Sequence, residues 1–132
     1  SDLNPGSGNG YTGLYSNAED MYKFAKAVFI DYSLVSENSL NQILNSFFFS
    51  ESGKHASSSG SIHRQDIDFF GDSILAYGHS GGDIGYSSNL TYIPMYNTIL
   101  VINYNYGTQF SSLIGEEITN LKKEIYFEAI SH

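Results

Sequence analysis

The order of hydrophobic and polar residues predicts two helices in the first third of the chain. Residues 1–12 are rich in Gly, Asn and Ser and offer almost nothing to bury, so we expect a flexible arm there. Ser16 and Glu19 then have the spacing of a capping box that starts a helix, which is predicted to run to about Asp31. Ser36 is predicted to cap a second, shorter helix. One-face helical spacing is found at Met21, Phe24, Ala25, Val28 and Phe29, and again at Leu40, Ile43, Leu44 and Phe47.

The pattern then changes to short runs that predict an antiparallel sheet. Residues 49–61 lack periodicity and indicate a loop. Residues 62–70 and 86–93 are typical of strands, and between them residues 74–77 precede the polar, glycine-rich stretch 77–88. The run 98–104 is apolar on both faces, so we expect packed layers on both sides of that strand. A last helix is predicted from about residue 109 to 130, with a core stripe at Phe110, Leu113, Ile114, Ile118, Leu121, Ile125 and Ala129. The predicted fold class is therefore α+β, an antiparallel sheet of three to four strands with N-terminal helices and a long C-terminal helix packed on it.

Composition limits the classes of partner. The chain has 132 residues, which suits one domain, and its 14 acidic residues against six basic ones argue against nucleic acid and against an anionic membrane surface. No apolar run approaches the roughly 20 residues that a membrane-spanning helix needs. The chain has no cysteine, so it offers neither a disulfide nor a thiol nucleophile. We expect no cofactor, and the 11 tyrosines and nine phenylalanines favour a half-buried sheet or a wet binding face.

The stretch 77–88 holds the densest candidate chemistry. It combines the His79 imidazole and the Ser80, Ser87 and Ser88 hydroxyls with four glycines. The Gly81-Gly82 pair lets a ligand or another backbone approach closely, and its amides can donate hydrogen bonds to a developing negative charge. The alternative interpretation is a glycine-rich hairpin with incidental polar residues.

Two further candidates are weaker. His55 and His63 with Asp66 and Asp68 could be drawn as a metal cluster, but their spacing fits no zinc signature. Asp66 and Asp68 would share one face of a strand, which favours solvated carboxylates over an acid–base couple. Asn89-Leu90-Thr91 matches a glycosylation sequon, but it lies inside a predicted strand.

Two motifs together resemble a known family. The run 13–21, Gly-Leu-Tyr-Ser-Asn-Ala-Glu-Asp-Met, is similar to the "Gly-Leu-x-Ser-Thr-Ala-Glu-Asp" helix start of penicillin-recognising serine hydrolases, which include class C β-lactamases, DD-peptidases and related esterases. The run 77–88 is similar to their "Tyr-Gly-His-Thr-Gly-Gly-x-x-Gly-Tyr-Ser-Ser". The following hairpin and the closing helix match in order and spacing, so the resemblance covers roughly residues 13–130.

The resemblance implies a role for each residue of the second motif. His79 would take the cationic or hydrogen-bonding place on the strand beside the nucleophile, and Ser80 would contact a substrate carboxylate or carbonyl. Gly81 and Tyr86 would belong to the substrate-binding surface, and the Gly82 amide would be one of two oxyanion donors. The resemblance also implies a bacterial periplasmic or secreted protein that acts on a small-molecule or peptide-like substrate.

One element of the family is missing from the sequence. The nucleophile of these enzymes lies in Ser-x-x-Lys, and no serine of this chain has a lysine three residues later. Residues 13–132 therefore resemble the C-terminal part of such an enzyme, and we expect no turnover without an N-terminal catalytic part. Two alternatives stay open. One is a non-catalytic module that binds a peptide or glycan through Gly81-Gly82 and Tyr86, and the other is a structural fragment that forms a homo-oligomer.

Overall fold

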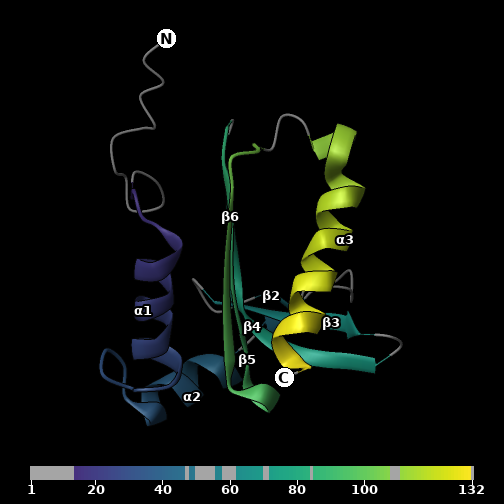
Figure 1. Ribbon diagram of the computed structural model, residues 1–132. Coiled ribbons are helices and arrows are strands. Elements are labelled where there is room, and N and C mark those ends of the chain that lie inside the picture. The colour runs from purple at the N-terminus through teal and green to yellow at the C-terminus, as the bar shows by residue number, and fades with distance from the viewer. Residues whose placement is uncertain are drawn as a thin grey trace.

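The protein folds as a four-stranded antiparallel sheet between two layers of helices. The computed structural model describes residues 14–46, 48–49, 56–57, 62–69, 72–83, 85–107 and 111–131. Helices α1 (Ala18–Phe29) and α2 (Glu37–Asn45) lie on one face of the sheet, and α3 (Ser111–Ile130) lies on the other (Figure 1). The predicted α+β class, with N-terminal helices and a long C-terminal helix packed on an antiparallel sheet, is confirmed. The arm predicted for residues 1–12 lies outside the described residues.

The four strands follow one another along the chain. They are β3 (His63–Phe69), β4 (Asp72–Gly82), β5 (Ser87–Ile93) and β6 (Thr98–Tyr104), in the order β3-β4-β5-β6 with every pair antiparallel. A 3₁₀ turn, η1 (Pro94–Tyr96), and Asn97 at φ 48° connect the last two strands. Asn tolerates this left-handed conformation better than most residues. A separate two-stranded sheet is formed by β1 (Phe48–Phe49) and β2 (Ala56–Ser57).

The caps of the two N-terminal helices differ in how well they were predicted. The N-cap of α2 is Ser36, as predicted, and its hydroxyl accepts a hydrogen bond from the Ser39 amide at 3.2 Å. The N-cap of α1 is Asn17, so the prediction of Ser16 was wrong by one residue. Asn17 Oδ1 accepts from the Asp20 amide at 2.9 Å, and Asn17 Nδ2 donates to Asp20 Oδ2 at 2.9 Å. This reciprocal pair satisfies an otherwise orphan backbone donor.

The core is divided by the sheet into two clusters. On the side of α1 and α2, the buried residues are Ala25, Val28, Phe29 and Leu40, and the Phe29 ring stacks on Tyr92 with centroids 4.9 Å apart. On the opposite side, Ile74, Ala76 and Ile93 are buried, with Ile130 of α3 packed against them. The layering on both sides that the apolar run 98–104 predicted is therefore confirmed, since Ile99 packs into the first cluster and Leu100 into the second.

Parts of the predicted helical stripes are exposed. Phe24 of α1 is 60% exposed, and in α3 the exposed fractions are 40% for Ile114 and 48% for Leu121. Among the described side chains of α3, Tyr126 is the buried one, and the sequence stripe did not include it. Its hydroxyl bonds to strand β5, and these bonds turn the helix face that contains Tyr126 toward the sheet. Phe110 and the side chain of Leu113 lie outside the described residues.

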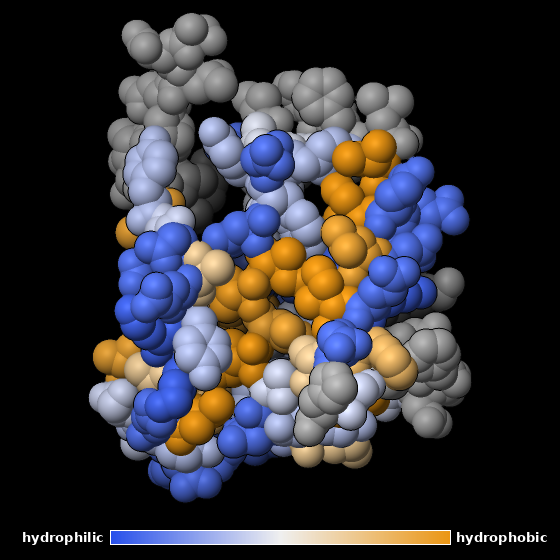
Figure 2. Space-filling view, in the orientation of Figure 1, coloured by the Kyte–Doolittle hydropathy of each residue, from blue (hydrophilic) through white to orange (hydrophobic). Residues whose placement is uncertain are grey.

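Hydrophobic side chains gather over β6 between α1 and α3 (Figure 2). Strand β6 is the last strand of the sheet order, and residues 98–102 are all partly exposed. Among the described helices, none is long and apolar enough to cross a membrane.

Candidate functional site

The predicted triplet His79-Ser80-Gly81 lies on a sheet strand, at the C-terminal end of β4. The pairing of β3 with β4 begins at His63 opposite Gly78. Among the described residues, positions 79–82 therefore have a strand partner only in β5. All of them are exposed. Within the described part of the chain, the triplet is thus an exposed strand end that pairs with β5 alone.

The two polar side chains of the triplet do not meet in one place. Neighbouring residues of a strand point to opposite faces, so His79 and Ser80 diverge. Ser80 lines a cleft beside α3, whereas His79 is absent from that lining. The His79 ring instead contacts His63 edge to face, with centroids 4.5 Å apart. His79 is thereby oriented by a second imidazole across the β3–β4 pair.

The glycines and Tyr86 occupy the hairpin that follows the triplet. Gly81 pairs with Ser88, and a Cβ at position 81 would lie 2.7 Å from the Ser88 hydroxyl, so a side chain there would displace that hydroxyl. Gly82 is the last residue of β4, and beyond it the Asp83 amide donates to the Tyr86 carbonyl at 2.9 Å. Tyr86 is 70% exposed and does not line the cleft. The substrate-binding role of Gly81 and Tyr86 and the oxyanion role of Gly82 stay predictions.

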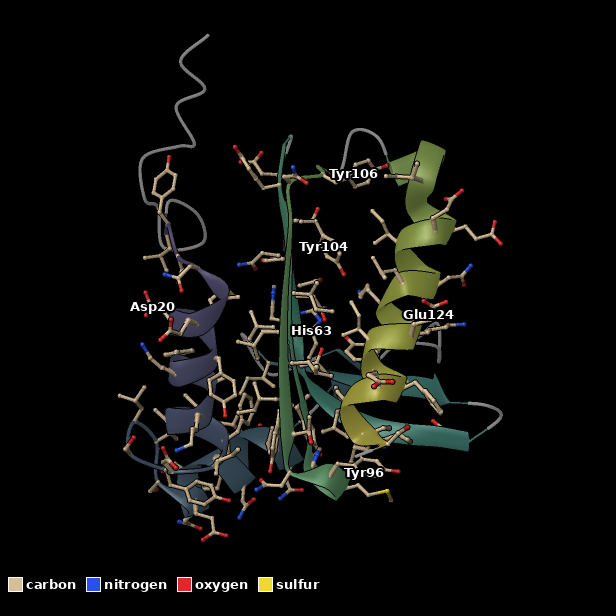
Figure 3. The ribbon with its side chains drawn as sticks, in the orientation of Figure 1. Asp20, His63, Tyr96, Tyr104, Tyr106 and Glu124 are labelled. Carbon is tan, nitrogen blue, oxygen red and sulfur yellow. The ribbon has the colours of Figure 1, made fainter. Side chains whose placement is uncertain are left out.

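The cleft itself lies between the ends of β4, β5 and β6 and helix α3, and its volume is about 340 Å³. Tyr104 extends from β6 toward α3, and Tyr106 lies beyond it where the chain leaves the sheet (Figure 3). The sheet supplies Ser80, Gly81, Gly82, Ser87, Ser88 and Asn89 to the lining. The last strand, the chain after it and α3 supply Tyr104, Tyr106, Gly107, Gly115, Ile118 and Lys122. Small residues on both walls therefore leave the space open.

Two groups in the cleft are electrostatically unusual. Burial lowers the pKa of the Lys122 ammonium, and within the described part of the chain this lysine has no ion-pair partner. Burial, followed by the charge interaction with Tyr126, raises the pKa of Tyr104 to about 12. The Tyr104 hydroxyl oxygen is buried and has no hydrogen-bond partner among the described residues. No Asp or Glu is among the described residues that line the cleft.

A buried polar network closes the cleft toward the middle of the sheet. Tyr126 Oη donates to Asn89 Oδ1 at 2.7 Å, and it lies 2.9 Å from Thr91 Oγ1. Thr91 Oγ1 also donates to Asn89 Oδ1 at 2.9 Å. Asn89 is only 3% exposed, which agrees with the interpretation that its sequon lies inside a strand. The network fixes α3 against β5 and so sets the distance between the walls of the cleft.

The other sequence candidates do not gather into a site. His55 and the side chains of Asp66 and Asp68 lie outside the described residues, and His63 contacts His79. Across the residues that the structure describes, no group of three or more His, Cys, Asp or Glu side chains could hold a metal ion. Sequence reasoning singled out the cleft serines but missed Lys122, Tyr104 and Tyr106. The only available signal was a lysine within the hydrophobic face of a helix.

Comparisons of this chain with protein-family models, with curated proteins and with solved structures found no match.

Proposed function

We propose that this chain is the C-terminal part of a β-lactamase-like serine hydrolase. The observation that supports it best is the position of His79-Ser80-Gly81 at the C-terminal end of β4, where the described residues pair with β5 only. An exposed strand edge can hold the amide group of an extended substrate by backbone hydrogen bonds. The exposed backbone of Gly81 and Gly82 next to it leaves room for such a substrate.

In the intact enzyme, the serine of a Ser-x-x-Lys motif outside this chain would attack an amide or ester carbonyl. The attack would expel the amine or alcohol, and water would then hydrolyse the acyl-enzyme to the acid and the free serine. This chain would supply one wall of the active site and the Gly82 amide as an oxyanion donor. A donor of this kind stabilises the transition state by roughly 3–4 kcal/mol. The partly exposed apolar strand β6, flanked by α1 and α3, supports an additional part of the protein at that edge (Figure 2).

The proposal is tested with a chromogenic β-lactam and an activated ester. The chain alone should give no sustained turnover, because it lacks the nucleophile. In the intact protein, Ser80→Ala should reduce kcat/KM, whereas Ser73→Ala, at the exposed opposite end of β4, should not. Sustained hydrolysis by the chain alone that survives Ser80→Ala would contradict the proposal.

The exposure of Tyr86 supports a second candidate, a non-catalytic module that binds a peptide or glycan. A large aromatic ring that is 70% exposed beside Gly85 is suited to stacking on such a ligand. This candidate predicts saturable binding without chemistry and its loss in Tyr86→Ala. Tyr15→Ala, at another largely exposed tyrosine near α1, is the control. A structural fragment that dimerises is the remaining alternative, and a strict monomer in light scattering at high concentration would exclude it.

A further inference from the structure

The cleft between β4–β6 and α3 is suited to one kind of ligand. We infer that it binds a small organic carboxylate whose charged end contacts Lys122 and whose apolar body lies between the tyrosine rings and Ile118. The inference shares Ser80 with the hydrolase proposal but does not depend on it, because it requires no nucleophile and no second chain. Either can fail without the other.

The polar side chains of the cleft offer hydrogen-bond donors and one positive charge. Lys122 carries the only formal charge among its described lining residues, although the whole chain has a net charge of −8. Ser80 and Ser87 share the sheet face of Asn89, so their hydroxyls stand on the strand wall opposite, whereas the Ser88 side chain points to the other face. An ammonium and hydroxyls facing one space, without a carboxylate among them, complement an anion through charge-assisted hydrogen bonds. A cationic ligand would find no counter-charge on these walls.

Two groups carry an energetic cost that a ligand would relieve. The Lys122 ammonium is half-buried and has no ion-pair partner in the described part of the chain, and its lowered pKa shows that burial disfavours its charge. The buried Tyr104 hydroxyl has no described hydrogen-bond partner. A buried polar group without a partner is destabilising, and a ligand that supplies the partner recovers that loss. A carboxylate has two acceptor oxygens, enough for both Lys122 and a hydroxyl.

Size and lining indicate that the ligand has an apolar body. A volume of about 340 Å³ is at the lower end of small-molecule sites, which span roughly 300–1,000 Å³. Gly107 and Gly115 give the walls no side chain, and Ile118 with the rings of Tyr104 and Tyr106 supplies apolar surface. Acetate would leave most of this space empty, whereas an arylacetate would occupy it.

The test is a titration of this chain followed by amide NMR spectra, with phenylacetate as the probe. Phenylacetamide has the same shape without the charge, and acetate has the charge without the ring. We expect saturable shifts at the Gly81, Gly82 and Gly115 amides and a Kd for phenylacetate about tenfold below that for phenylacetamide, equivalent to 1.4 kcal/mol. Acetate should bind more weakly than both. Absence of saturable shifts with phenylacetate, or equal affinity for the acid and the amide, would overturn the inference.

Two variants and one measurement on the unmodified protein complete the test. Lys122→Met keeps the length of the side chain, and it should abolish the preference for the acid over the amide. Lys123→Met, the neighbouring exposed lysine outside the cleft, should leave it unchanged. If Lys122→Met does not fold, NMR titration of the Lys122 ammonium in the unmodified protein tests the contact with the carboxylate instead. Phenylacetate should raise its pKa, and an unchanged pKa at saturation would refute the proposed contact.

Discussion

The buried network of Tyr126, Thr91 and Asn89 gives a sharp stability prediction. The Tyr126 and Thr91 hydroxyls and Asn89 Oδ1 make three contacts of 2.7–2.9 Å. The two hydroxyls have one proton each, so at most two of these contacts are hydrogen bonds at one time. In Tyr126→Phe one of the two protons is removed, while Thr91 still donates to Asn89. No polar group is left without a partner, so the loss is that of one buried hydrogen bond. We therefore expect the free energy of unfolding to fall by about 1–1.5 kcal/mol.

The pH dependence of this loss has a defined sign. Burial raises the pKa of Tyr126 above its ordinary value of 10.0, partly opposed by the hydrogen bond with Thr91. A raised folded-state pKa contributes stability that is complete below pH 10 and is lost as the pH rises through the folded-state pKa. Phenylalanine does not titrate. The deficit of Tyr126→Phe relative to the unmodified protein should therefore be largest below pH 10 and shrink above it.

Thermal and urea denaturation at several pH values measure these effects. Near neutral pH we expect the Tm of Tyr126→Phe to fall by about 3–5 °C for a chain of this size. Thr91→Val should cost a similar amount, because Tyr126 still donates to Asn89. The double variant should lose more than the sum, because it leaves the buried Asn89 Oδ1 without either donor. A double variant that loses less than the sum, or a deficit that grows above pH 10, would refute the reasoning.

Two further predictions concern the backbone. A Cβ at Gly78 would overlap the carbonyl oxygen of Leu90 and lie 2.9 Å from its carbonyl carbon. Gly78→Ala should therefore lower the free energy of unfolding by about 1–3 kcal/mol, as measured by urea denaturation. Gly85→Ala, where nothing lies within 4 Å, should change stability far less, and equal effects would contradict this explanation. Asn17→Ala removes the α1 cap and should cost about 0.5–2 kcal/mol, whereas Ser16→Ala should be nearly neutral in the same assay. The reverse ranking would place the cap at Ser16.

Local patterns predicted the elements of this fold well. The Ser36 cap, the strand at 86–93 and the layers on both sides of the run 98–104 all follow from spacing within a few residues. The α1 cap was displaced because Ser16 and Asn17 each have an acidic residue three positions later. Both residue types are good caps, so propensity does not separate them.

The rotation of α3 and the cleft could not be predicted in this way. The face of α3 is set by the contact of Tyr126 with Thr91, which is 35 residues away in the sequence. The lining of the cleft comes from three strands and a helix, and its serines and glycines matter because they are small. Helical spacing places Lys122, unlike Lys123, beside the apolar stripe of α3, but only the packing of the helix shows that it lines a cleft.

The position of β6 at the end of the strand order has a consequence for amide hydrogen exchange. Strand β5 is flanked by β4 and β6, so its amides bond to one neighbour or the other along its length. Strand β6 has a described neighbour on one side only, so alternate amides point away from β5. Deuterium uptake along residues 98–104 should therefore alternate with a period of two residues, fast and slow in turn, while β5 stays uniformly protected.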